Sequence, residues 1–179
     1  MSILDELRRR AAERATGMRV VLAEGDDPRV VRAAEEAQRQ GLCRPLLVAS
    51  EAAARGAAAE AGVELTVPCL DPADDPEMPA LLAHLGARLA ESGLAAEALE
   101  AMCRERLHYA ALLVAVGRAD GAVMGAVATT GDTVRAALRA VGRGAWGAVS
   151  AANRRPSSST AVAQPNAVAT NRPFSASGV

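Results

Sequence analysis

Short apolar runs that alternate with helix-forming segments are the feature of this sequence that most limits its fold. The runs RVVLA, PLLVA, VELTV and GAVM predict strands at residues 19–23, 45–49, 63–67 and 121–124. Segments with helical periodicity lie between them. Because connections of this kind place helices on both faces of a sheet, the sequence predicts an α/β fold with a mainly parallel sheet covered by helices.

The helical segments have recognisable starts and stops. Pro28 suits the first turn of a helix, and Gly41, Gly62 and Gly93 mark helix ends. The apolar stripe of the first helix is expected to pack against the outside of the domain. Three prolines and four acids at residues 69–79 indicate a surface connection. Helices are expected over residues 2–15, 28–40, 51–61, 80–91 and 94–116.

The last strand leads into a Gly/Thr turn at residues 125–131 and a helix that we expect to be capped by Asp132. Such a turn can direct unpaired backbone N–H groups at an anion, and the helix dipole favours negative charge there. Phosphate is the natural candidate, with hydroxyl donors from Thr129 and Thr130 and a guanidinium from Arg135. The alternative is a turn that binds nothing, since many strand-to-helix turns contain Gly and Thr.

Composition excludes several function classes. All 20 basic residues are arginine, so no lysine is present for a Schiff base, a pyridoxal phosphate anchor or a P-loop. One Trp, one Tyr, one Phe and a net charge of -1 argue against binding to nucleic acid or an anionic membrane. No apolar run is long enough to span a membrane, and no secretory signal is recognisable, which predicts a soluble, cytoplasmic protein.

Metal and disulfide chemistry find little support in the sequence. Three widely separated cysteines favour reduced thiols over a disulfide framework or a metal cluster. Glu105 and His108 have the Glu-x-x-His spacing of some metal sites, but no second pair completes a coordination shell. We therefore expect His84 and His108 to be partly exposed helix residues and predict no metal site.

The chain changes character after residue 142. Residues 143–179 contain four arginines and no acid, whereas residues 1–142 contain 16 arginines and 21 acids. The segment is rich in Ala, Ser, Pro, Asn and Thr without an apolar period, so we predict a low-complexity, disordered tail. The predicted domains are therefore residues 1–142 and this tail.

Two motifs give residues 1–142 a family resemblance. They are VVLAEGDDPRVVRAA at residues 20–34 and GRADGAVMGAVATTGDTVRAALRAVG at residues 117–142. With the comparable spacing between them, these segments resemble the N-terminal half of the phosphate acetyltransferase family, which includes the acyltransferase domain fused to some malic enzymes. The resemblance implies a two-domain fold related to isocitrate dehydrogenase, a cytoplasmic homodimer, and acetyl transfer between coenzyme A and phosphate. It implies no metal and no cofactor, with coenzyme A as a substrate.

The resemblance also implies roles for individual residues. Arg135 and Arg88 fall on family arginines that bind the phosphate-bearing substrates, and Thr129 and Thr130 lie in the turn before Arg135. The sequence departs from the family at Ala23, where proline is common, and at Ala128, where histidine is common. The second departure removes a hydrogen-bonding imidazole from the turn.

The family residues that stabilise the transition state and activate the thiol lie in C-terminal sequence that has no match here. We therefore nominate no catalytic residue and expect a truncated acyltransferase with weak or no activity. A basic, acid-free ending directly after the match is also typical of a reading-frame shift. The alternatives are a regulatory module that binds acyl-CoA or phosphate without chemistry, and a half-domain that pairs with another chain. A nicotinamide enzyme is disfavoured because GxGxxG is absent after the first strand.

Overall fold

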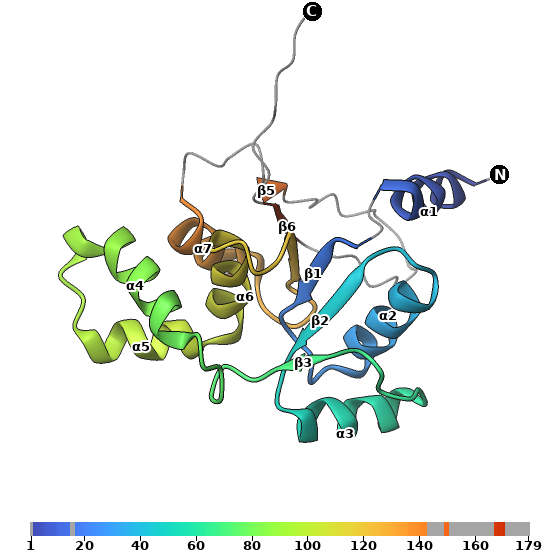
Figure 1. The fold of residues 1–179 in the computed structure, drawn as a ribbon, viewed down its shortest axis with the longest axis horizontal. Coiled ribbons are helices and arrows are strands. Elements are labelled where there is room, and N and C mark those ends of the chain that lie inside the picture. Colours follow the sequence, from blue (N-terminus) through green and yellow to red (C-terminus); the bar gives the residue numbers. More distant parts are fainter. Residues whose placement is uncertain (1, 15–16, 143–148, 151–166, 171–179) are drawn as a thin grey trace, which may run out of the picture.

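The computed structural model describes residues 2–14, 17–142, 149–150 and 167–170, which are built around one central sheet (Figure 1). The strand order is β3-β2-β1-β4-β6-β5. The first four strands are mutually parallel, β6 runs antiparallel to β4, and β5 runs antiparallel to β6. The strands are β1 (Arg19–Leu22), β2 (Arg44–Val48), β3 (Cys69–Leu70), β4 (Gly121–Met124), β5 (Val149–Ser150) and β6 (Ala167–Thr170).

Helices cover both faces of this sheet, which confirms the predicted α/β class. In Figure 1, α2 and α3 lie on one side of the strands, and α6 and α7 lie on the other with α4 and α5 beyond them. The helices are α1 (Ile3–Arg14), α2 (Pro28–Arg39), α3 (Glu51–Ala61), α4 (Met78–Arg88), the 3-10 turn η1 (Ala90–Ser92), α5 (Ala96–Arg104), α6 (Arg106–Ala115) and α7 (Thr130–Ala140).

Two hydrophobic cores follow from the alternation of side chains along the strands. On β1, Val21 packs into the core shared with α4, α6 and α7, whereas Leu22 packs into the core shared with α2 and α3. Both side chains are buried, because a parallel sheet with helices on both faces leaves neither face to water. The strands are therefore held by packing on both faces, and so are the starting points of the loops that follow their carboxyl ends.

The third strand lies later in the chain than predicted. Residues 63–67 form no strand; instead Cys69 and Leu70 pair with Leu47 and Val48 of β2. Glu35 on α2 explains the difference, because its carboxylate accepts hydrogen bonds from the Thr66 and Val67 amides at 2.7 and 2.8 Å. Those amides are therefore engaged by a side chain from another element.

The long helix predicted over residues 94–116 is divided in two. Glu105 has an extended backbone, with φ -69° and ψ 127°, and separates α5 from α6. Its carboxylate accepts hydrogen bonds from the Leu107 and His108 amides at 3.1 Å each, as an N-cap. The predicted helix over residues 80–91 also ends early: α4 stops at Arg88, and η1 leads to Gly93 at φ 68°.

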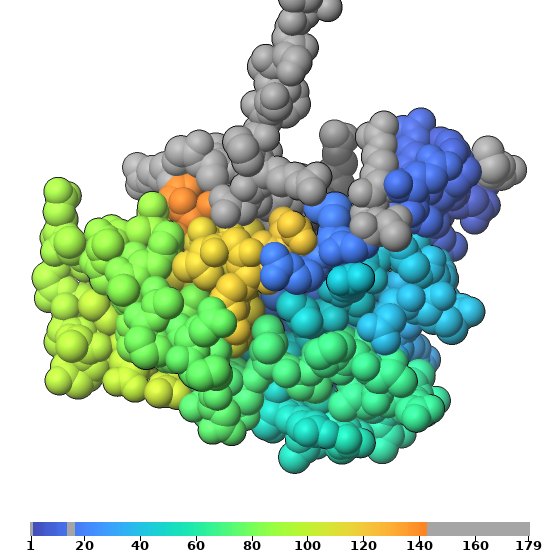
Figure 2. Space-filling model, viewed as in Figure 1, coloured from blue at the N-terminus to red at the C-terminus, as the bar shows by residue number. Residues whose placement is uncertain are grey.

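The structure describes parts of both ends of the chain. In the predicted low-complexity tail, residues 149–150 and 167–170 form β5 and β6 on the sheet, and the remaining residues from 143 onward lie outside the described part. The stripe expected to pack α1 onto the domain is largely exposed, with Ile3 at 81%, Leu4 at 59% and Leu7 at 56%. Figure 2 shows α1 at the rim of the molecule. No described helix has the length and apolar character to cross a membrane.

Candidate functional site

The carboxyl ends of β1 and β4 lie side by side at the point where the strand order reverses. From β1 the chain proceeds to β2 on one flank, while β4 lies on the other. Ligands of open α/β sheets bind outside the carboxyl ends of the strands at such a point. The turn that we predicted to hold an anion follows β4 here.

The carboxylate of Glu24 fills this turn. Its Oε2 accepts hydrogen bonds from the amides of Gly125 and Ala126 at 3.0 and 2.6 Å. Its Oε1 accepts from Val127 and Ala128 at 2.9 and 2.8 Å. Glu24 is only 2% exposed. The prediction that these amides are unpaired is therefore wrong, because an internal anion from the loop after β1 already binds them.

Sequence reasoning did not single out Glu24, although a signal for it exists. Glu24 follows β1 with one residue between them, and the turn follows β4 directly. Since β1 and β4 are parallel neighbours, these two loops meet at the same edge of the sheet. Arg29 adds a second link between them, since its guanidinium donates to the Ala126 carbonyl at 3.3 Å and to Asp27 at 2.6 Å. The hydrogen bond from Arg29 holds the pKa of Asp27 below its ordinary value.

The threonines organise the start of α7. Thr129, rather than Asp132, is the N-cap: its Oγ1 accepts from the Asp132 amide at 3.2 Å and donates to the Asp132 carboxylate at 2.7 Å. The Thr129 hydroxyl thus satisfies the N3 amide as an N-cap and is itself held by the Asp132 carboxylate. The hydrogen bonds from Thr129 and then Arg135 lower the pKa of Asp132. Thr130 is the first residue of α7.

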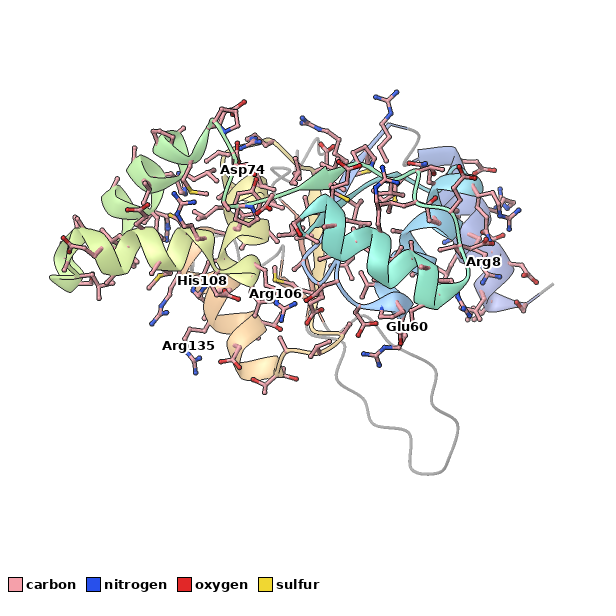
Figure 3. All side chains as sticks on the ribbon, turned by 90° about the horizontal axis from the view of Figure 1, so that it is seen from below. Arg8, Glu60, Asp74, Arg106, His108 and Arg135 are labelled. Atoms are coloured by element: carbon pink, nitrogen blue, oxygen red, sulfur yellow. The ribbon has the colours of Figure 1, made fainter. Side chains whose placement is uncertain are left out.

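Arg135 and Arg88 both line a different place, which we name the α4/α7 groove. Its volume is about 540 Å³. Arg135 is 55% exposed and forms an ion pair with Asp132 at 2.6 Å, and Figure 3 shows its side chain pointing away from the body of the protein. The groove is lined by Arg88, Leu89, Gly131, Val134, Arg135, Leu138 and Arg139. Of the described residues, those seven form the lining, and neither Thr129 nor Thr130 is among them.

Side chains of α4 also hold the last turn of α7. The Arg88 Nε donates to the Arg139 carbonyl at 3.1 Å, and the His84 Nε2 lies 3.1 Å from the Ala140 carbonyl. A Cβ atom at Gly142 would overlap the Arg88 guanidinium, which therefore occupies the space that a side chain there would need. A cation at this position suits the negative end of the helix dipole.

Glu105 and His108 form a pair at the start of α6. The His108 Nδ1 lies 2.7 Å from the Glu105 Oε2, and the buried His108 Nε2 has no hydrogen-bond partner. Burial opposes ionisation of Glu105, but hydrogen bonds from His108 and two amides lower its pKa. The Glu-x-x-His spacing thus serves helix capping. Within the described ranges, no three His, Cys, Asp or Glu side chains are placed to share a metal ion.

The cysteines are poor nucleophiles where they stand. Burial raises the pKa of Cys43 and Cys69, and it raises the pKa of Cys103 to about 11. All three are free thiols. They therefore remain protonated at neutral pH.

Comparisons with known proteins identify the family. The phosphate acetyl/butaryl transferase family matches residues 2–152. The phosphate acetyltransferase of Paracoccus denitrificans is 38% identical over 133 residues, which cover 74% of this chain and 38% of that relative. The phosphate acetyltransferase of Deinococcus radiodurans is 35% identical over 130 residues, or 72% of this chain and 18% of that relative.

Solved structures agree with this assignment. EutD phosphotransacetylase from Staphylococcus aureus superposes with a TM-score of 0.72 at 25% identity, over 79% of this chain and 44% of that one. A phosphotransacetylase from Streptococcus pyogenes superposes with a TM-score of 0.69 at 29% identity, over 78% of this chain and 43% of that one. The chain spans less than half the length of these relatives. Because the family match extends over most of its residues, the chain belongs to the phosphate acetyltransferase family.

Proposed function

We propose that this chain serves acetyl transfer between coenzyme A and inorganic phosphate, and that the α4/α7 groove binds a phosphate-bearing substrate. One observation carries the proposal: Arg88 and Arg135 come from two separate helices and line one groove. Arg139 lines it as well, and Leu89, Val134 and Leu138 supply apolar walls. Guanidinium groups match phosphate oxygens two at a time, and apolar walls suit the organic part of such a ligand.

The reaction needs charge stabilisation and one proton acceptor. The coenzyme A thiolate attacks the carbonyl of acetyl phosphate through an oxyanionic tetrahedral state, and phosphate leaves; the reverse reaction returns the acetyl group to phosphate. Arginines can position the phosphate group and stabilise the negative charge of the tetrahedral state electrostatically, without bonding covalently to the substrate. We assign Arg135 and Arg88 to substrate binding, with Thr129 and Thr130 supporting the turn that leads to Arg135.

The proton acceptor has no candidate in the groove. Among the described residues, the seven that line it include no carboxylate, imidazole or thiol. A general base must lie within hydrogen-bond reach of the proton that it removes. We therefore propose that this chain by itself binds substrate with weak or no turnover. The same observation favours the second candidate, a module that senses acyl-CoA or phosphate without catalysis.

The remaining features of the proposal follow from the family. We propose a cytoplasmic homodimer that uses coenzyme A, acetyl phosphate and phosphate as substrates, with no resident metal or cofactor and no nucleic-acid or membrane partner.

Thermal unfolding with added coenzyme A tests the binding. A ligand at about 100 times its dissociation constant stabilises the folded state by about 2.7 kcal/mol. We expect this stabilisation in the wild-type chain and its loss in Arg135→Ala and Arg88→Ala. Arg39→Ala is the matched control for Arg135, because Arg39 is also an exposed helical arginine paired with an acid three residues earlier, at 2.5 Å from Glu36.

The assay for turnover separates the two candidate functions. Acetyl-CoA formed from acetyl phosphate and coenzyme A is measured with the same protein samples. Binding without product supports the sensing module, and binding with slow product formation supports the weak enzyme. A wild-type chain that coenzyme A does not stabilise, or an Arg39→Ala chain that loses the stabilisation as fully as Arg135→Ala, contradicts the proposed groove.

A further inference from the structure

We propose that Glu24 is a positioning residue: its carboxylate acts as an internal anion that holds loop 125–128 and thereby places the start of α7, which carries Arg135. Loop 125–128 would accept a small carboxylate from solution if the Glu24 side chain were removed. The effect on substrate affinity rests on the proposed function of the groove, whereas the effect on the loop does not.

The contacts of Glu24 account for its burial. A carboxylate that is 2% exposed loses its water, and it is tolerated only when hydrogen bonds replace that water. Four backbone amides do so, at 2.6–3.0 Å. Successive amides that converge on one anion form an anion-binding nest. The occupant of this nest is a side chain of the same chain.

The backbone around Glu24 holds it in this position. The Gly25 amide donates to the Val48 carbonyl at 3.2 Å, and the Ala23 amide donates to the Val123 carbonyl at 3.1 Å. Glu24 therefore lies between two residues that are bonded to opposite neighbouring strands. In the loop that binds the Glu24 carboxylate, Gly125 has φ 97°, a left-handed conformation that glycine adopts readily and that starts the turn.

The loop that Glu24 binds lies directly before α7, which carries Arg135 and other residues of the α4/α7 groove. Loop 125–128 is followed by Thr129, the N-cap of α7, and then by Gly131 and Arg135, which line the groove. Displacement of the loop would therefore move the N-terminal end of α7, while Arg88 and His84 hold its other end. Glu24 does not itself line the groove, so it acts through the loop and α7.

Each carboxylate oxygen holds a different part of the loop, which gives the proposal a specific signature. Oε2 binds the Gly125 and Ala126 amides, and Oε1 binds those of Val127 and Ala128. Glu24→Gln keeps one acceptor oxygen and turns an NH₂ donor toward the other pair of amides. We expect one part of the loop to keep its protection from hydrogen exchange and the other to lose it. Glu24→Ala removes both acceptors.

Hydrogen exchange resolved to single amides tests this signature. In Glu24→Ala, the amides of Ala126, Val127 and Ala128 should exchange about tenfold faster or more, as expected when a hydrogen bond to a charged acceptor is lost. In Glu24→Gln, either Ala126 or the Val127 and Ala128 pair should show this change, but not both. Added formate should restore protection in Glu24→Ala in a saturable manner and leave the wild-type chain unchanged.

Glu35→Ala is the matched control. Glu35 also clamps a loop, with hydrogen bonds from the Thr66 amide, the Thr66 hydroxyl and the Val67 amide at 2.6–2.8 Å, but its loop lies away from α7. Its removal should destabilise the chain without affecting exchange at residues 126–128 or coenzyme A affinity. Glu24→Ala should weaken coenzyme A binding several-fold, and formate should reverse that loss.

The outcomes separate this inference from the proposed function. Exchange at residues 126–128 that stays at the wild-type rate in Glu24→Ala, or formate protection that appears equally in Glu35→Ala, would overturn the role of Glu24. If the wild-type chain binds no coenzyme A, the proposed function fails, but the exchange measurements still decide whether Glu24 holds the loop. If Glu24→Ala does not fold, the one-sided signature of Glu24→Gln decides.

Discussion

Replacing Gly25 with alanine would place a methyl group between β2 and the loop that carries Glu24. The added Cβ would lie 3.0 Å from the Leu47 Cβ, 3.1 Å from the Val48 carbonyl oxygen and 3.2 Å from the Ala49 Cβ. Each of these atoms is fixed to the backbone of β2 or of the residue after it, so relief requires backbone movement. Overpacking of this kind lowers the free energy of unfolding by about 1–3 kcal/mol.

Gly56→Ala is the matched comparison, because the same chemical change occurs where space is open. Gly56 is an exposed residue of α3, and a Cβ there would meet nothing within 4 Å. Alanine in a helix interior is more stable than glycine by roughly 0.5–1 kcal/mol. The two variants should therefore shift stability in opposite directions and differ from each other by roughly 1.5–4 kcal/mol.

Urea denaturation followed by circular dichroism measures the difference. The dependence of unfolding free energy on urea should be the same in both variants, so that only the midpoints move. In thermal unfolding, each kcal/mol corresponds to about 2–4 °C for a chain of this size. A Gly25→Ala chain as stable as the wild type would show that the loop moves away from β2 without energetic penalty, and the argument that the backbone beside Glu24 is held in place by β2 would be refuted.

Three further predictions concern side chains that form well-defined hydrogen bonds: Tyr109, Asp75 and Thr129. Burial, and then the 2.6 Å hydrogen bond to Asp75, raise the pKa of Tyr109, so this single tyrosine should resist ionisation in the folded state. Its contribution to stability is complete below about pH 10 and is lost as pH rises through the folded pKa. Phenolate absorbance in an alkaline titration measures this ionisation. Burial opposes ionisation of Asp75, but hydrogen bonds from Arg118 and Tyr109 lower its pKa, so this contribution to stability is present above about pH 4 and lost as pH falls through the folded value. Asp75→Ala should lower the free energy of unfolding by about 1–3 kcal/mol and remove that acid dependence, and equal acid sensitivity in the variant would contradict it. Thr129→Ala should lower the free energy of unfolding by about 1 kcal/mol through loss of the α7 N-cap, measured by the same urea titration. Thr66→Ala is the hydroxyl-deletion control outside any helix.

Local sequence patterns predicted most of the α/β framework. The apolar runs at β1, β2 and β4 and the glycines at 41 and 62 placed three strands and two helix ends, because periodicity and backbone conformation are local properties. Two of the failures occurred where a side chain engages the backbone. Glu105 starts a new helix inside an unbroken helical pattern, and Glu35 takes the amides of a segment that reads as a strand.

The candidate site depended on tertiary structure to a greater degree. The sequence by itself identified a turn rich in potential anion-binding amides and two arginines that resemble family residues. Only the fold showed that the turn is occupied by Glu24, from 101–104 residues earlier in the chain, and that Arg88 and Arg135 share the α4/α7 groove. The physical reason is that amides and carboxylates pair according to which strand ends are neighbours, and strand order is set by packing of the whole sheet rather than by local sequence.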